Sequence, residues 1–244
     1  MIYLIGLGLN EDGISKQGLE ALKNCKKVYL EGYTVNFPYD ISELKLSKKI
    51  IKLERGDVES NRLIKEAKST KIALLVYGSP LFATTHMSLI LDAHEQGVRT
   101  RIIYSASVFD AIASTGLQLY KFGKTASMPS WQEDKKYRPE SFMEVIKENQ
   151  SIKAHTLLLI DIGLDFEQAL YQLEQSSKDV KLDKIIVCEQ LGTKEEKIYY
   201  DKIKELEKLK VKNPFCFIIP SEFHFLEREA LEKSIKDVQS IQSD

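Results

Sequence analysis

The sequence has only three cysteines, and none of them lies close to another along the chain. Cys25, Cys188 and Cys216 form no Cys-x-x-Cys pair, so we expect neither a disulfide framework nor a zinc or other metal site. No apolar stretch approaches the ~18 residues that a helix needs to cross a bilayer, so no membrane partner is expected. The opening apolar run lacks the basic start and the length of a signal peptide. These absences predict a cytoplasmic protein.

The sequence also lacks an excess of either charge. Its 35 Lys and Arg residues nearly balance 36 Asp and Glu residues, which gives a formal net charge of -1. Proteins that bind nucleic acid normally carry a basic stripe, so nucleic acid is not the expected partner. With 244 residues, the chain can build one large core or two modest ones without disulfides or metal ions to stabilise them.

Short apolar runs alternate with helix-like segments in the first half of the chain. This alternation predicts a mostly parallel sheet with crossover helices. The expected strands are residues 2–5, 27–30, 49–53, 71–76 and 99–104. Ser15 and Asp57 can begin the first two helices as N-caps. Thr84 or Thr85 can begin the third, and Gly97 can end it in the left-handed conformation.

The pattern changes after Gly116 and predicts a boundary between two domains near residues 104–116. The strands expected beyond it are residues 119–128, 155–161, 184–188 and 215–219. Pro139 suits the first position of a helix that contains Phe142. Further helices are expected at residues 165–175, 199–210 and from 222 onward.

Two glycine turns that follow apolar strands are the most informative motif. The first is Gly6-Leu-Gly8 and the second is Gly78-Ser-Pro80. Such turns, at the carboxyl ends of buried strands, are where open α/β sheets bind small molecules, because bare backbone lets a ligand approach closely. A third turn, residues 105–107, would lie at the same edge of the sheet.

The turns do not fit the known phosphate-binding motifs. A dinucleotide fingerprint would need a glycine where Glu11 stands, and a carboxylate there would repel a pyrophosphate. Glu31 does lie at a plausible distance for a ribose-binding acid. No Gly-Lys-Ser or Gly-Lys-Thr occurs, which excludes a P-loop. The turns therefore suit a ligand without phosphate, such as S-adenosylmethionine, or are ordinary turns with no ligand.

Five segments of the chain resemble diphthine synthases, which are S-adenosylmethionine-dependent methyltransferases of the tetrapyrrole-methylase type. These segments cover almost the whole chain in the right order. They are Tyr3-Leu-Ile-Gly-Leu-Gly-Leu9, Gly78-Ser-Pro-Leu-Phe-Ala-Thr-Thr-His86, Gly116-Leu-Gln-Leu-Tyr-Lys-Phe-Gly123, Arg138-Pro-Glu-Ser-Phe142 and His155-Thr-Leu-Leu-Leu-Ile-Asp-Ile162.

The resemblance implies both an architecture and a reaction. The architecture is two α/β domains, residues 1–110 with a mostly parallel sheet and 111–244 with a mixed sheet, with the cofactor in a cleft between them and two chains in a homodimer. The reaction is repeated methylation of the amino group of a 3-amino-3-carboxypropyl-histidine on translation elongation factor 2, giving diphthine. Because eukaryotic relatives add a further methyl as an ester, the number of methyl groups stays open.

The resemblance also implies which residues bind the cofactor S-adenosylmethionine. They are Leu9, Ser79, Phe82, Ser107 and Val108 in the first domain, and Ile160, Leu191 and Phe215 in the second. Two of these positions depart from the family pattern. The second turn usually reads Gly-Asp-Pro, and archaeal relatives often carry histidine where Phe215 aligns. Without the acid, one polar contact with the cofactor is expected to be missing, while backbone contacts would remain.

No catalytic residue is assigned, because methyl transfer to an amine needs positioning above all. Asp110 and Asp161 are candidates to take the proton of the amine, although Asp161 could simply cap a strand end. His86 could contact the substrate or close a local hydrogen bond. The loop around Trp131 could dock the elongation factor or be a solvated connector. Two other functions stay open: an inactive binding protein, and methylation of a tetrapyrrole or rRNA.

Overall fold

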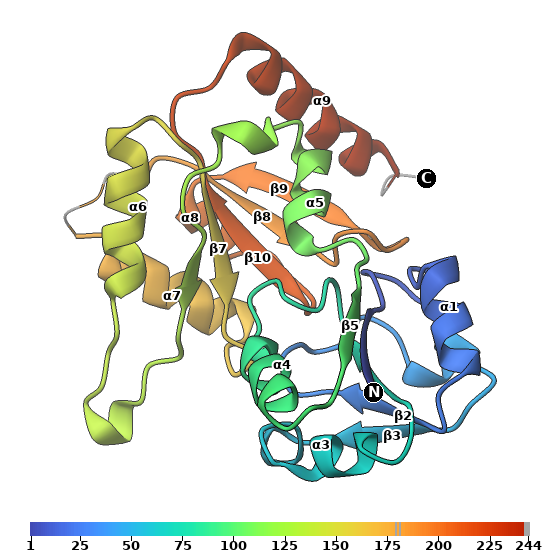
Figure 1. Ribbon diagram of the computed structural model, residues 1–244. Helices are drawn as coiled ribbons and strands as arrows, with labels where there is room; N and C mark the ends of the chain where they lie inside the picture. Colours follow the sequence, from blue (N-terminus) through green and yellow to red (C-terminus); the bar gives the residue numbers. More distant parts are fainter. Residues whose placement is uncertain (179, 181, 242–244) are drawn as a thin grey trace. The chain divides into compact units, whose positions relative to one another are not determined.

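The chain forms two compact units, Met1–Val108 and Phe109–Asp244. The computed structural model describes residues 1–178, 180 and 182–241. Each unit contains one five-stranded sheet (Figure 1). The first sheet is wholly parallel, and the second mixes parallel and antiparallel pairs. This arrangement confirms the predicted α/β class and the difference between the two sheets.

The first unit is a parallel sheet in the order β3-β2-β4-β1-β5. Its strands are β1 (Ile2–Gly6), β2 (Lys27–Glu31), β3 (Ile50–Leu53), β4 (Ile72–Val76) and β5 (Thr100–Ile103). Its helices are α1 (Lys16–Lys23), η1 (Ile41–Leu44), α2 (Arg55–Val58), α3 (Arg62–Ala67) and α4 (His86–Glu95). Residues of α3 and α4 pack in one core cluster with one face of the sheet, and residues of α1 pack in another. Both faces of the sheet are therefore covered, as the nearly continuous apolar strands predict.

The helix starts of the first unit agree only in part with the predicted caps. The Ser15 side chain accepts a hydrogen bond from the backbone N–H of Gly18, which confirms it as a cap. Gly97 follows α4 with a φ of +71°, as predicted. The prediction for Asp57 is wrong, since Glu54 precedes α2 and Asp57 lies inside it, where its carboxylate accepts a hydrogen bond from Arg62.

The second unit is a mixed sheet in the order β6-β7-β10-β8-β9. Its strands are β6 (Ala126–Met128), β7 (Thr156–Ile160), β8 (Ile185–Glu189), β9 (Lys197–Asp201) and β10 (Phe215–Ile219). Its helices are α6 (Ser141–Ser151), α7 (Phe166–Ser176), α8 (Ile203–Leu206) and α9 (Phe225–Ile241), and α5 (Val108–Ala111) spans the boundary between the units. Short 3-10 helices are η2 (Ile112–Thr115), η3 (Leu119–Lys121) and η4 (Glu133–Lys135). Residues of α6, α7 and α8 share one core with the sheet, whereas α9 contacts β9 and η2.

Three predictions about the second unit are wrong. Residues 119–128 do not form one strand, because Asn149 bonds both backbone groups of Lys124 and only Ala126–Met128 pairs with β7. Residues 199–210 do not form one helix, because Lys197–Asp201 pairs with β8 as an edge strand. Pro139 is not the first helical residue, since α6 begins at Ser141.

A buried carboxylate, Glu227, joins the start of α9 to three other segments. It accepts hydrogen bonds from the backbone N–H groups of Gln118 and His224 and from Nζ of Lys121, and it lies 3.3 Å from Nε2 of His155. Burial opposes its ionisation, but these donors outweigh burial and lower the pKa of Glu227 to about 2. His155 accepts from Ser221 N–H at Nδ1, so its proton is on Nε2 and points to Glu227. His155 is therefore structural.

We expect this carboxylate to make the stability of the second unit depend on pH. Because the pKa of Glu227 is depressed in the folded state, its contribution is complete above the ordinary value of 4.5 and is lost as the pH falls toward about 2. Glu227→Gln should lack this dependence, so its stability deficit against the wild type should shrink across that range. Urea unfolding, followed by the fluorescence of the single tryptophan Trp131, measures the difference. A deficit that stays constant as the pH falls would contradict the assignment.

Candidate functional site

The carboxyl edge of the first sheet brings the three predicted turns together. Strands β4, β1 and β5 are parallel neighbours in that order, so the loops that follow them leave the same edge (Figure 1). The chain continues from β1 toward β2 on one side and from β4 toward β5 on the other. The connections thus reverse between β1 and β4, which is the position where open α/β sheets bind ligands.

The first two turns pair directly through their main chains. Gly8 N–H donates to Gly78 O at 3.2 Å, and Gly78 N–H donates to Gly8 O at 2.9 Å. Both glycines have left-handed backbones, with φ of +73° and +68°. A Cβ atom on Gly8 would lie 2.9 Å from the Cα and the carbonyl oxygen of Gly13. Both glycines are therefore favoured by their backbone conformation, and Gly8 is also required by space.

The third turn joins the first two, and two side chains hold the three turns together as one cluster. Ser105 Oγ donates to Gly13 O at 2.8 Å, and Tyr77 donates its hydroxyl to Leu9 O at 3.0 Å. Burial raises the pKa of Tyr77, so the hydroxyl keeps its proton. Sequence reasoning missed the roles of Gly13 and Tyr77. A further glycine a few residues after the Gly-x-Gly motif could have indicated the role of Gly13. No local sequence pattern distinguishes Tyr77 from the other tyrosines.

The five site residues predicted in the first unit all lie on these three turns. Leu9 and Ser107 are buried, and Ser79, Phe82 and Val108 are half-buried. The turns, residues 6–13, 77–84 and 104–108, contain no Lys or Arg. The cluster thus offers main-chain groups and short side chains without the positive charge that a phosphate ligand requires.

The three site residues predicted in the second unit lie at one end of its sheet. Ile160 ends β7, Phe215 begins the antiparallel β10 and is paired with Glu189, and Leu191 follows β8. The ring of Phe215 packs edge-on against Phe166, with their centroids 5.6 Å apart. The structure therefore groups these three residues, although they are far apart in sequence.

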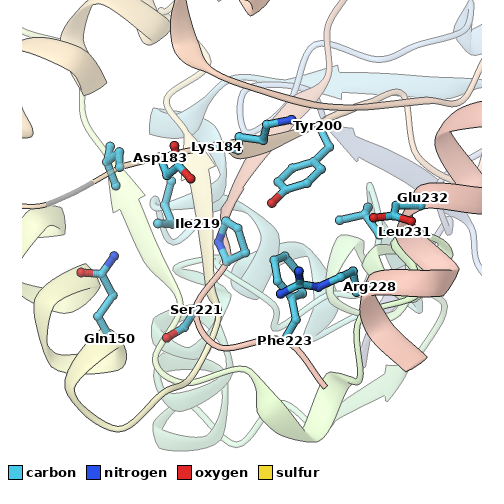
Figure 2. Close-up of a pocket in the computed structure, with 12 residues that line it drawn as sticks. Gln150, Asp183, Lys184, Tyr200, Ile219, Ser221, Phe223, Arg228, Leu231 and Glu232 are labelled. Carbon is cyan, nitrogen blue, oxygen red and sulfur yellow. The ribbon is translucent and has the colours of Figure 1, made fainter. Parts of the chain in front are cut away.

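A pocket of about 450 Å³ lies at the opposite end of the second sheet (Figure 2). It borders the end of β10 and the start of β8, whereas the predicted residues border the start of β10 and the end of β8. Lys184 lies over the ring of Tyr200, and Arg228 lies over the ring of Phe223. None of the predicted site residues lines this pocket.

The structure also shows what several of the polar side chains contact. Glu31 is fully buried and faces His86 at 3.2 Å, so its side chain is not placed to bind a ribose. Asp161 accepts hydrogen bonds from Ser130 N–H and Gly163 N–H, which makes it the cap of a strand end. Within the described residues, no three His, Cys, Asp or Glu side chains are grouped so that they could hold a metal ion. In the same part of the chain, no helix is long and apolar enough to cross a membrane.

The Trp131 side chain contacts one basic and one aromatic side chain. The Arg138 guanidinium lies 4.7 Å from the centre of the indole ring, and Tyr171 packs against its edge at 6.5 Å. The backbone N–H of Trp131 donates to Oε1 of Gln172, whose side-chain amide donates to Pro129 O. The loop around Trp131 is thus fastened to α7, and its predicted role in docking a partner stays a prediction.

Comparison with known proteins then places the chain in a family. The family of Tetrapyrrole (Corrin/Porphyrin) Methylases matches residues 1–207. The diphthine synthase of Methanocaldococcus jannaschii is 38% identical over 253 residues, which cover 95% of this chain and 98% of that protein. This chain belongs to the diphthine synthases of the tetrapyrrole methylase family. It is therefore a methyltransferase of diphthamide biosynthesis.

Other relatives of this diphthine synthase family member agree in sequence and in fold. The diphthine methyl ester synthase of Schizosaccharomyces pombe is 42% identical over 183 residues, covering 73% of this chain and 64% of that protein. A crystal structure of a diphthine synthase superposes with a TM-score of 0.87 at 35% identity, covering 97% of this chain and 99% of that one. The tetrapyrrole-methylase fold predicted from sequence is confirmed.

Proposed function

We propose that this protein transfers methyl groups from S-adenosylmethionine to the amino group of the 3-amino-3-carboxypropyl-histidine of translation elongation factor 2. Membership of the diphthine synthase family supports the reaction. The observation that carries the proposal is the mutual pairing of Gly8 and Gly78, which builds a main-chain site without lysine or arginine at the reversal point of a parallel sheet.

The residues present fit this donor. S-adenosylmethionine supplies a methyl group already activated on a sulfonium, so the protein needs no nucleophile of its own. The turns that carry Leu9, Ser79 and Ser107 would hold it through backbone groups, because no lysine or arginine lies on them. Phe82 and Val108 would supply apolar contacts. Ile160, Leu191 and Phe215 stay predicted contacts from the second unit.

The chain's contribution to the reaction is to position and desolvate the amine. Alignment of reacting atoms supplies much of the rate gain in such displacements. The amine must also lose a proton in each round. Asp161 accepts two backbone hydrogen bonds at a strand end. Asp110 is exposed on α5 and stays a predicted candidate for the acceptor.

The elongation factor and a second copy of this chain are the proposed partners. The family resemblance supports both, and the loop around Trp131 and Arg138 is the surface we propose for the elongation factor. Light scattering of the purified protein tests the dimer, and a monomeric mass would contradict it.

Mass spectrometry tests the proposed function directly. Elongation factor 2 that carries the aminocarboxypropyl histidine should gain one or more methyl masses after incubation with this protein and S-adenosylmethionine. The number of gains counts the rounds of transfer. The matched control is elongation factor with the unmodified histidine, which should gain none. A modified substrate that gains no mass, while the protein binds the donor, would show an inactive binding protein instead.

A further inference from the structure

A buried pair of titratable groups, Glu31 and His86, connects the end of β2 to the start of α4. Their side chains are 0% and 1% exposed, and Glu31 Oε2 lies 3.2 Å from His86 Nε2. Within the described residues, neither atom has a hydrogen-bond partner, so the two meet only as a close polar contact. The other carboxylate oxygen, Oε1, accepts a hydrogen bond from Thr34. Because the two facing atoms are buried, the stability of their contact depends on how many protons the pair holds.

The contacts of the imidazole fix that number. His86 Nδ1 lies 3.0 Å from Pro80 O, and a carbonyl oxygen can only accept, so Nδ1 carries a proton. A neutral imidazole has no second proton, and Nε2 would then present a lone pair to Glu31 Oε2. Two buried acceptors that face each other without a proton are unfavourable. The pair therefore holds one further proton, on Nε2 or on the carboxylate.

The same contacts connect the pair to the second glycine turn. Pro80 O accepts from His86 and from Thr84 Oγ1 at 2.7 Å, and Ala83 between them adopts a left-handed backbone with a φ of +54°. If the further proton is lost, the ring can keep its bond to Pro80 or donate to Glu31, but it cannot do both. Loss of the proton therefore loosens either the turn or its anchor on β2.

We propose that Glu31 and His86 are positioning residues that share one proton and thereby hold residues 78–82 in the conformation that binds the methyl donor. The inference rests on the proposed function, because Ser79 and Phe82 of this turn are the predicted donor contacts.

Two polar side chains lie near the pair. Tyr33 is two residues after Glu31, and burial together with the Glu31 charge raises the pKa of Tyr33 to about 12, so its hydroxyl keeps its proton near neutral pH. Arg55 lies over the Tyr33 ring at 5.6 Å, and it lies 3.9 Å from Glu59, the residue after α2.

Glu31→Gln replaces the shared proton by an amide proton. Its amide N–H would donate to Nε2 of a neutral His86, and its carbonyl would still accept from Thr34. Glu31→Ala removes the group that faces Nε2, and we expect it to lower the affinity for S-adenosylhomocysteine at least tenfold, roughly the effect of one charge-assisted hydrogen bond. The affinity of Glu31→Gln should differ from that of the wild type by less than about threefold. Calorimetry measures these affinities, and Glu59→Gln, which alters an exposed acid nearby, should match the wild type.

Two outcomes would overturn the inference. The first is an equal loss of affinity in Glu31→Ala and Glu31→Gln. The second is a nitrogen NMR spectrum in which the ring of His86 is neutral with its proton on Nε2, assigned among the four histidines with a His86→Gln variant. A wild type that binds no S-adenosylhomocysteine would instead contradict the proposed function, and the NMR spectrum would still test the shared proton.

Discussion

Gly8→Val should weaken binding of S-adenosylmethionine by at least about 100-fold, which is the largest functional effect that we expect from one substitution. Gly8 has a φ of +73°, a conformation that a β-branched residue adopts only under strain. Its Cβ would also lie 2.9 Å from the backbone of Gly13, which cannot move without disturbing Ser105. The turn must therefore open, and its pairing with Gly78 would be lost.

Gly56→Val is the matched control for this change. Gly56 lies exposed in α2, and a Cβ there would meet nothing within 4 Å. Calorimetry should show wild-type affinity for Gly56→Val and none that is measurable for Gly8→Val. Circular dichroism would establish that both variants are folded. Normal affinity in a folded Gly8→Val protein would remove the glycine turns from the donor site.

Glu227→Ala should destabilise the second unit by about 3–5 kcal/mol, the largest effect on stability that we expect. The substitution leaves two buried backbone N–H groups, of Gln118 and His224, without their acceptor. It also leaves the Lys121 ammonium without its carboxylate. Each lost partner adds a desolvation penalty that the alanine cannot offset.

The control for this variant lies on the same helix. Glu229 is exposed and pairs with Lys233 one turn along α9, so Glu229→Ala should leave the stability of the second unit close to that of the wild type. Trp131 belongs to the second unit, and its fluorescence reports unfolding of that unit in urea. A midpoint for Glu227→Ala equal to that of Glu229→Ala would show that the buried network contributes nothing.

The parallel sheet could be predicted from the sequence because a local residue pattern marks each of its strands. Residues such as Ile72–Val76 are apolar on every position, and a strand buried on both faces leaves that mark. The Gly-x-Gly turn and the Ser15 cap are likewise properties of a few neighbouring residues. The turns of the site could therefore be located from sequence, together with Leu9 and Ser79.

The remaining features depend on partners that are distant in sequence. Residues 199–210 are predicted as one charged helix, but residues 197–201 form a strand because they pair with β8. The pairing of Gly8 with Gly78, and of Glu31 with His86, likewise joins segments that no local pattern connects. The distance of Glu31 from the first glycine turn in the sequence does not reveal that its side chain is buried.

A crystal structure of the protein with S-adenosylhomocysteine tests the central claim most directly. The account predicts the ligand on the turns that carry Leu9, Ser79 and Ser107, held by main-chain atoms beside Gly8 and Gly78. A ligand bound only in the pocket of Tyr200 and Arg228 (Figure 2), with the three turns bare, would contradict it.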